Sequence, residues 1–332
     1  MTPTIDLYAL GNALVDAEYE VDDRFIRDQG VEKGQMTLVD AARIGELARA
    51  LTDVTPKRES GGSAANTAIA VRGFGATVFY SCKVADDEDG HHFAAGMNGV
   101  GIHTNPNDPH APGTTGRCLI MITPDAERTM TTYLGISEEL STAELDEPKL
   151  CSSRYLYIEG YLASSTTGRE AAIHARSVAE RSNVITSLTL SDASMVNYFG
   201  DDLRRMVGNG IDLLFCNEVE ALTWCKTDRI DIAAKELKDM ARGFAITLGG
   251  RGALVHTGNR NHEVAGNAVR AVDTNGAGDI FAGACLWGLM QGQPLEHAAR
   301  FANFAAARLV TCFGARLPFG EYAALRERFP GH

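Results

Sequence analysis

A short glycine-rich loop that ends in an aspartate carries the residue types from which chemistry could be built. Asp273–Ile280 reads DTNGAGDI, and an apolar run continues to Met290. The small residues Gly276, Ala277 and Gly278 permit a tight turn with accessible backbone N–H groups, and the apolar run predicts a buried helix that begins there. Unpaired N–H groups and the positive end of the helix dipole meet at this point, which favours a bound anion.

Asp279 is the informative residue of this loop. Its carboxylate would repel a bound phosphate, so we interpret it as a general base beside a group that is being transferred. The alternative is an aspartate that only complements the helix dipole. The chain contains no G-x-x-x-x-G-K-[ST] segment, and Phe281 breaks a G-x-G-x-x-G match. The loop is therefore neither a P-loop nor a dinucleotide fingerprint.

The loop resembles the second signature of the PfkB (ribokinase-like) family of carbohydrate and nucleoside kinases. Ser60–Ala68, which reads SGGSAANTA, resembles the first signature of that family. The resemblance runs along the whole chain, so it implies one PfkB-type kinase domain over residues 1–332. It also implies a phosphotransferase with an alcohol group as acceptor and with ATP as co-substrate.

The hydrophobic pattern predicts an α/β fold. Strands expected at 155–158, 184–190 and 213–216 alternate with helices expected at 167–181 and 194–207. This order is typical of a doubly wound, mostly parallel sheet flanked by helices, as in ribokinase-like proteins. Two insertions with mixed, short alternating patterns, at about 17–39 and 113–135, predict a small β-sheet that forms a lid. This lid offers apolar groups able to cover a flat base, namely Tyr19, Phe25, Met36 and Met130.

In the family, the aspartate of the GAGD segment is the catalytic base, and here this residue is Asp279. It would take the proton of the attacking hydroxyl. The backbone N–H groups of Asn275, Gly276, Ala277 and Gly278 would hold the negative charge that develops on the phosphoryl group.

A possible metal site follows the strand expected at 213–216. Asn217 and Glu220 lie one helical turn apart and match the N-x-x-E motif that the family associates with Mg²⁺ and phosphate. Such a pair can also be a helix cap. Asp192, after another strand, is expected at the same sheet edge and could add to this site.

Further nucleotide contacts are implied by the resemblance alone. Thr247, Gly249 and Gly252 match a T-x-G-x-x-G turn near the ribose and phosphates of ATP, although a hairpin turn also explains them. Asn303 matches a position near the adenine. Asp273, together with the loop that follows the helix expected at 295–309 and is closed by Gly314, resembles the site at which ribokinases bind a monovalent cation such as K⁺.

The acceptor is expected at Asp16, Gly61, Gly62 and Asn66, which match positions that bind sugar hydroxyls. A carboxylate that holds two vicinal hydroxyls recognises a furanose directionally. Within the family, segments 11–16, 128–130, 133–135 and 159–161 resemble the adenosine-kinase branch. We therefore expect a nucleoside kinase that acts on the 5′-hydroxyl of adenosine; a ribokinase- or fructokinase-type sugar kinase and a non-catalytic nucleotide sensor remain alternatives.

Composition limits the other classes of function. The net charge of −12 over 332 residues argues against a nucleic-acid partner. The longest apolar run is too short to span a bilayer, and the N-terminal segment lacks the pattern of a signal peptide. Seven scattered cysteines indicate reduced thiols, so we expect a cytoplasmic monomer or homodimer. The acidic segment 86–89 is interpreted as a solvated loop and helix start rather than a metal site.

Overall fold

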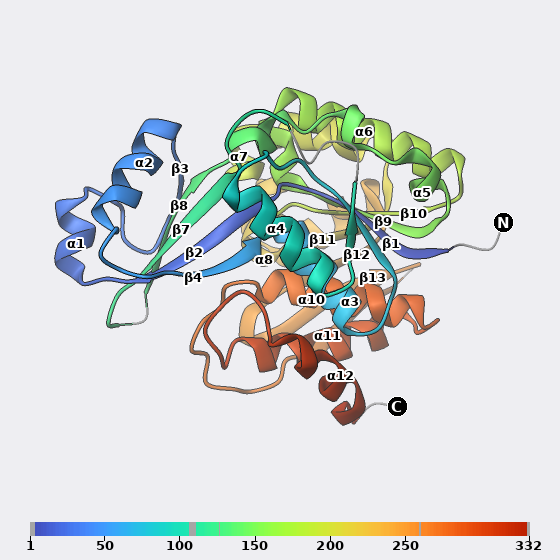
Figure 1. Cartoon of the computed structure of the whole chain (residues 1–332). Helices are drawn as coiled ribbons and strands as arrows, with labels where there is room; N and C mark the ends of the chain where they lie inside the picture. Colours follow the sequence, from blue (N-terminus) through green and yellow to red (C-terminus); the bar gives the residue numbers. More distant parts are fainter. Residues whose placement is uncertain (1–3, 106–110, 126, 259, 331–332) are drawn as a thin grey trace.

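A sheet of nine strands forms the centre of the molecule (Figure 1). The structure is a computed structural model that describes residues 4–105, 111–125, 127–258 and 260–330. The strand order is β14-β13-β12-β11-β10-β9-β1-β5-β6. The strands are β1 (Ile5–Leu10), β5 (Val78–Ser81), β6 (His103–Thr104), β9 (Ser153–Glu159), β10 (Ile185–Thr189), β11 (Ile211–Asn217), β12 (Ala241–Thr247), β13 (Gly252–Thr257) and β14 (Arg260–Ala265).

Seven of these strands, β6 to β12 in the spatial order, run parallel, and β13 and β14 close one edge, each antiparallel to its neighbour. Parallel strands need a crossover, and helices provide it on both faces of the sheet. The predicted doubly wound sheet is therefore confirmed. It arises because the buried strands carry near-continuous apolar runs and the intervening segments carry one apolar face.

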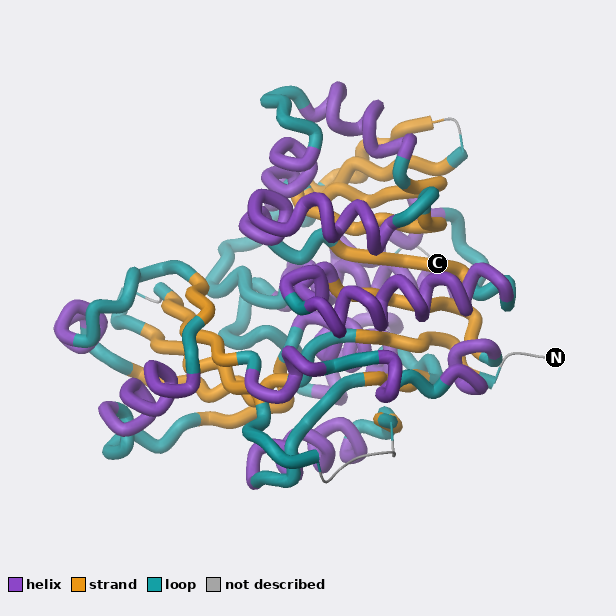
Figure 2. The backbone as a smooth tube through the Cα atoms, turned by 90° about the horizontal axis from the view of Figure 1, so that it is seen from above, coloured by secondary structure: helices purple, strands orange, loops and turns teal. Residues whose placement is uncertain are grey.

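Helices pack on the two faces of the sheet and bury two large apolar clusters (Figures 1 and 2). One layer contains α3 (Ser63–Gly73), α4 (Glu88–Gly99), α10 (Ala277–Met290), α11 (Leu295–Leu309) and α12 (Phe319–Arg328). The other contains α5 (Glu147–Cys151), α6 (Thr166–Arg181), α7 (Ala193–Val207), α8 (Glu218–Trp224) and α9 (Ile230–Glu236).

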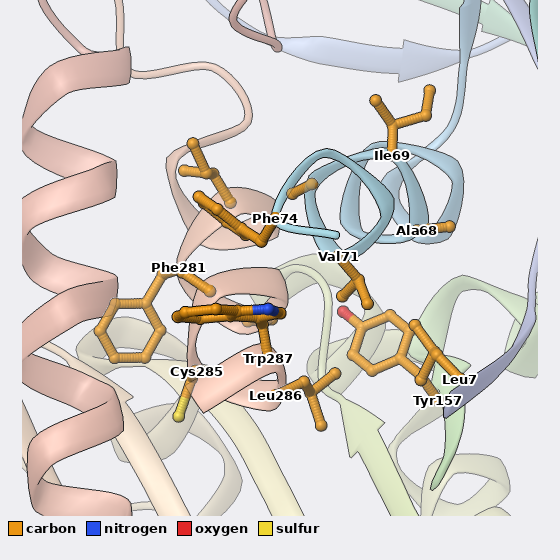
Figure 3. Close-up of a cluster of buried hydrophobic side chains, with 14 of the residues drawn as sticks. Leu7, Ala68, Ile69, Val71, Phe74, Tyr157, Phe281, Cys285, Leu286 and Trp287 are labelled. Atoms are coloured by element: carbon orange, nitrogen blue, oxygen red, sulfur yellow. The ribbon is translucent and has the colours of Figure 1, made fainter. Parts of the chain in front are cut away.

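Close packing of α3 on α10 fixes the two glycine-rich segments relative to each other. A Cβ placed on Gly283 would lie 2.8 Å from the Cβ of Ala70, so only a glycine allows this approach. The ring of Phe74 lies against Trp287, with centroids 5.7 Å apart, in the apolar cluster of Figure 3. Dense apolar packing of this kind leaves little freedom for relative motion. The start of α10 is therefore held rigidly beside α3.

A second sheet of five strands, the small sheet, projects from one side of the large one (Figure 1). Its order is β3-β8-β7-β2-β4. Helices α1 (Asp23–Asp28) and α2 (Ala41–Ala50) belong to this part of the chain, and α2 packs on one face through Ile44 and Leu47. The strands are β2 (Leu14–Glu20), β3 (Met36–Leu38), β4 (Lys57–Gly61), β7 (Gly116–Ile122) and β8 (Arg128–Tyr133).

Strand β4 lies outside the segments 17–39 and 113–135 that the sequence pattern indicated. Residue 126 of the second segment lies outside the described residues. Five short 3₁₀ helices complete the fold: η1 (Gly135–Glu139), η2 (Thr142–Glu144), η3 (Gly160–Ser164), η4 (Leu237–Asp239) and η5 (Gly249–Arg251).

The acidic segment 86–89 is a helix start, as predicted, but it is only partly solvated. Asp87 caps α4 by accepting the N–H of Gly90. Asp89 is 2% exposed and lies between the guanidinium groups of Arg58 and Arg117, on strands β4 and β7. The interpretation of Asp89 as solvated is therefore wrong, because a buried carboxylate needs such partners. Within the described ranges, no group of three or more His, Cys, Asp or Glu side chains is arranged to hold a metal.

The cysteines and the longest helices bear on two further expectations from the sequence. All seven cysteines fall within the described ranges, and each is a free thiol. None of the helices in the described part of the chain combines the length and apolar character that crossing a bilayer requires.

Candidate active site

A cavity of about 340 Å³ lies between the carboxyl ends of the central strands and the small sheet. Residues that follow β1, β10 and β11 line it, together with the glycine-rich start of α10. Open α/β sheets place their ligands at this edge. Of the predicted site residues, the cavity is lined by Asp16, Gly62, Asn66, Asn217, Glu220, Thr247, Asn275, Gly276, Ala277, Gly278 and Asp279.

Asp279 is held at the first turn of α10 by residues of α3. Its Oδ1 accepts a 2.7 Å hydrogen bond from the hydroxyl of Ser63, and its Oδ2 accepts a 2.9 Å bond from Nδ2 of Asn66. The hydroxyl of Thr67 donates to its backbone carbonyl at 3.3 Å. These contacts orient the carboxylate while it still lines the cavity. The contribution of Ser63 was not predicted, because a residue so distant in sequence gives no signal for it.

The electrostatic surroundings of Asp279 suit a proton acceptor. Burial raises its pKa to about 6, and the bonds from Ser63 and Asn66 and the charge of Arg316 oppose that rise. A carboxyl with a pKa near the working pH is ionised at neutral pH and is more basic than an exposed aspartate. Such a perturbed group in a cavity is a candidate for catalysis.

The loop before α10 has the tight geometry that the glycines predicted. Gly276 has a φ of 71°, and a Cβ there would lie 2.2 Å from the carbonyl oxygen of Ala315. The loop uses two of its own N–H groups: Asn275 donates to Asp273, and Ala277 donates to the carbonyl of Thr274. Within the described structure, the N–H groups of Gly276 and Gly278 have no such partner. Both are available to an anion.

Asp16 lies on β2 at the small-sheet end of the cavity. Burial raises its pKa to about 7, and the positive charge of Arg316 opposes that rise. Gly61 on the neighbouring strand β4 makes room for it, because a Cβ there would lie 2.2 Å from the carboxyl carbon of Asp16. Gly61 itself does not line the cavity, although Gly62 does.

Asn66 connects this end of the cavity to Asp279. Its side chain is 6% exposed, and its Nδ2 is used by Asp279. Its Oδ1 is buried and has no hydrogen-bond partner among the described residues. Buried polar atoms are normally satisfied, so this oxygen marks a point in the site where a hydrogen bond is missing.

Glu159 is a buried part of the site whose position the sequence did not reveal. Its two carboxylate oxygens accept the N–H groups of Asn12 and Ala64, each at 2.8 Å. Ala64 is in the first turn of α3, so this carboxylate satisfies one of the free N–H groups of that helix. Burial raises the pKa of Glu159 to about 7. Glu159 thereby positions the helix that carries Ser63 and Asn66.

Asn217 and Glu220 form a complete capping box at the start of α8. The carboxylate of Glu220 accepts both the backbone N–H and the side-chain amide of Asn217. The helix-cap interpretation of this pair is therefore correct. Burial raises the pKa of Glu220 to about 7, and the negative charges of Asp192 and Asp279 add to the rise.

This donor set fits a magnesium ion that is bound through water. Glu220, Asn217 and Asp192 line the same cavity, and like charges at Asp192 and Asp279 oppose the ionisation of Glu220. Mg²⁺ prefers such hard oxygen donors and keeps several of its waters. A cation here would relieve the excess of negative charge.

The other residues that were predicted to contact the nucleotide do not lie together in the cavity. Thr247 lines the cavity at the end of β12, whereas Gly249, in the turn after β12, and Gly252, the first residue of β13, lie outside its lining. The hairpin-turn interpretation of this segment is correct. Asn303 is buried in α11 and donates its amide to the carbonyls of Val264 and Ala265, at 3.1 Å each. The structure does not bring Asn303 into the cavity.

The expected K⁺ site does not suit a cation, because a guanidinium group already occupies it. Oδ1 of Asp273 accepts the N–H of Asn275 at 3.0 Å, and Oδ2 accepts the N–H of Gly314 at 2.8 Å. Nε of Arg128 lies 2.8 Å from the same Oδ2. The residues that surround Asp273 therefore already supply its positive partner.

Apart from Asp16 and Thr132, the side of the cavity formed by the small sheet is apolar. Successive strand residues face opposite sides of a sheet, so alternate positions share the face that points to the cavity. Tyr19 and Phe25, which were expected to be able to cover a flat base, pack instead with α2 in the small-sheet core. The apolar residues of the cavity from this part of the chain are Leu14, Met36, Leu38, Cys118, Ile120, Met130 and Leu134.

Comparison with known proteins places this site in a family. Residues 37–320 match the model of the pfkB family carbohydrate kinases. Adenosine kinase from Saccharomyces cerevisiae is 26% identical, over 95% of this chain and 97% of that protein.

Two solved structures are similar over nearly all of the chain. The adenosine kinase from Sinorhizobium meliloti is 32% identical with a TM-score of 0.89, and covers 98% of this chain and 99% of its own. A probable sugar kinase from Rhizobium etli is 31% identical with the same TM-score and the same coverage. The chain therefore belongs to the pfkB family of carbohydrate kinases and is a sugar or nucleoside phosphotransferase.

Proposed function

We propose that this kinase transfers the γ-phosphoryl group of ATP to the 5′-hydroxyl of adenosine. The observation that carries this proposal is that the acceptor end of the cavity has a polar and an apolar part. The polar part contains the side chains of Asp16 and Asn66. The apolar part is formed by small-sheet residues such as Met36 and Met130, on the face of the sheet that also carries Asp16. A nucleoside has a polar ribose and a flat, weakly polar base, whereas a free sugar has no part that uses the apolar side.

The charges around the cavity favour an acceptor without a phosphate of its own. A sugar phosphate needs cationic donors for its second phosphate. Among the described residues that line the cavity there is no lysine or arginine. Three other cations are paired elsewhere in the fold: Lys33 with Asp23 and Asp125, Lys83 with Glu144, and Arg117 with Asp89.

The proposed step is a direct transfer. The carboxylate of Asp279 takes the proton of the 5′-hydroxyl while the hydroxyl oxygen forms a new bond to the γ-phosphorus. The bond between the γ-phosphorus and the oxygen that bridges it to the β-phosphate breaks, and ADP is released. The N–H groups of Gly276 and Gly278 stabilise the charge on the transferred group. Mg²⁺, held through water near Glu220, Asn217 and Asp192, would neutralise charge on the ATP phosphates. Met36 and Met130 would exclude water from the reacting hydroxyl.

The pH dependence of the reaction follows from the ionisation of Asp279. Its pKa of about 6 means that the carboxyl is protonated below that pH and cannot accept the proton. We expect kcat to fall about tenfold for each pH unit below about 6 and to level off above it. A kcat profile for adenosine between pH 5 and 8.5 measures this. A profile that is flat down to pH 5 would contradict Asp279 as the base.

The role of Glu220 is tested by replacing it with glutamine. Glu220→Gln keeps the capping shape but removes a charge, so we expect the Mg²⁺ concentration for half-maximal rate to rise about five- to twentyfold. The KM for the acceptor should change much less. The half-buried neighbour Glu218 pairs with Arg251, and Glu218→Gln is the matched control. If the Mg²⁺ titration of Glu220→Gln is the same as that of the wild type, Glu220 does not help to bind the ion, and Asp192 is the next candidate.

The proposal is tested by measuring ADP release with a panel of acceptors: adenosine, guanosine, cytidine, ribose and fructose. We expect adenosine to give the highest kcat/KM. A higher value for ribose or fructose would replace the nucleoside assignment by a sugar kinase. ATP binding without turnover of any acceptor would instead indicate a nucleotide sensor.

A further inference from the structure

We propose that Arg128 replaces the monovalent cation at the catalytic loop, so that this chain carries its own positive charge there and does not need K⁺. This inference goes beyond the proposed function, because it concerns the loop and not the acceptor. It rests on the contacts of Asp273, which precedes the glycine-rich turn.

The carboxylate of Asp273 is 8% exposed and has its positive partner within the protein. Nε of Arg128 lies 2.8 Å from its Oδ2, and the guanidinium is equally enclosed, with a side chain that is 6% exposed. The contact is an ion pair without an aligned hydrogen bond. The backbone N–H groups of Asn275 and Gly314 occupy the other sides of the carboxylate. A metal ion beside Oδ2 would have to displace the guanidinium.

The charges around Arg128 are already balanced. Its Nη1 lies 3.1 Å from Oε1 of Glu18, and Oε2 of Glu18 lies 4.0 Å from Nζ of Lys57. The row continues through Glu59, which pairs with Lys57 at 2.9 Å and with Arg316 at 3.0 Å. From Asp273 to Arg316 the signs alternate, so the row has no net charge. An additional cation would lie beside a fixed guanidinium, and like charges in a buried setting repel strongly.

A guanidinium differs from a dissolved cation in two ways. It does not lose its proton in a protein, so its charge is present at every physiological pH and salt composition. It also belongs to β8 of the small sheet, whereas Asp273 belongs to the loop that leads into α10. The guanidinium of Arg128 therefore neutralises Asp273 only while the small sheet lies against this loop. A dissolved ion would not link the charge at the loop to the position of the small sheet.

The test compares the thermal unfolding of the full chain in 100 mM KCl and in 100 mM tetramethylammonium chloride, without substrates. For the wild type we expect the same Tm in both salts. Arg128→Met leaves the carboxylate of Asp273 without its partner, so K⁺ should now bind and raise the Tm of this variant by about 2–4 °C over tetramethylammonium. Arg128→Lys keeps a positive charge and should respond much less.

A matched control comes from the same sheet. Arg58 also pairs with a buried carboxylate, that of Asp89, but as the residue between Lys57 and Glu59 on β4 it faces the other side of the small sheet. Arg58→Met should therefore show no K⁺-specific shift. A K⁺-specific rise in the Tm of the wild type would overturn the proposal, because a cation would then bind beside Arg128. Equal Tm values for Arg128→Met in both salts would overturn it as well.

If Arg128→Met does not fold, the wild-type comparison and Arg128→Lys still decide the question. None of these measurements uses a nucleoside or ATP. A failure of the acceptor assignment would therefore leave this result unchanged.

Discussion

The Asp279→Asn variant is expected to lose about two to four orders of magnitude in kcat while it keeps its affinity for ATP. The amide cannot accept the proton of the attacking hydroxyl at neutral pH. The variant should still fold, because the new amide oxygen can face the Nδ2 of Asn66 and the new NH₂ group can donate to the hydroxyl of Ser63. Steady-state kinetics with adenosine give kcat, and calorimetry gives the dissociation constant of ATP.

The control for this experiment is Asp231→Asn, which makes the same change at an exposed aspartate that pairs with Arg229. It should have wild-type activity. If Asp279→Asn keeps a kcat within about threefold of the wild type, the proton goes elsewhere and the catalytic assignment is wrong.

Asp16→Asn is expected to lower kcat/KM for adenosine by about two to three orders of magnitude. The ionised carboxylate can accept hydrogen bonds from two vicinal hydroxyls, whereas the amide offers one acceptor and turns a donor toward the other hydroxyl. The wild type should also discriminate against 2′-deoxyadenosine, which lacks one of these hydroxyls. The variant should discriminate much less, because the interaction is already lost.

Measuring the wild type and Asp16→Asn with both adenosine and 2′-deoxyadenosine separates the loss of the contact between Asp16 and the 2′-hydroxyl from general damage to the fold. Glu20→Gln, at the exposed end of the same strand, is the control. If Asp16→Asn lowers the rates of adenosine and 2′-deoxyadenosine by the same factor, Asp16 does not hold the 2′-hydroxyl.

The order of strands and helices could be predicted from the sequence because periodicity is a local property. The apolar run after Ile280 gave α10 almost to the residue. Strand β4, in contrast, was not predicted. Its residues, Lys57 to Gly61, are mostly polar, and it lies at an edge of the small sheet, where no alternating pattern is required.

The parts of the site that depend on distant residues could not be predicted in the same way. The glycine-rich loop and Asp279 were recognisable, but the hydroxyl that orients Asp279 comes from Ser63, far away in sequence. The pairing of Arg128 with Asp273 is equally non-local. A buried charge needs a partner, but only the fold determines which one it finds.

The orientation of the small sheet explains why the expected role of Tyr19 was wrong. Tyr19 was a reasonable candidate to cover a base, but a one-residue difference on a strand decides between the two faces. The face of β2 that carries Asp16 points to the cavity, and Tyr19 points to the helices behind the sheet.

The central claim is that the acceptor is a nucleoside, and a competition reaction tests it most directly. The enzyme, Mg²⁺ and limiting ATP are mixed with adenosine and ribose at equal concentrations, and the phosphorylated products are separated and quantified by mass spectrometry. Their ratio equals the ratio of the two kcat/KM values. We predict that adenosine 5′-monophosphate exceeds ribose phosphate by at least about a hundredfold, because only adenosine fills the apolar side of the cavity. Equal amounts, or an excess of ribose phosphate, would contradict the account.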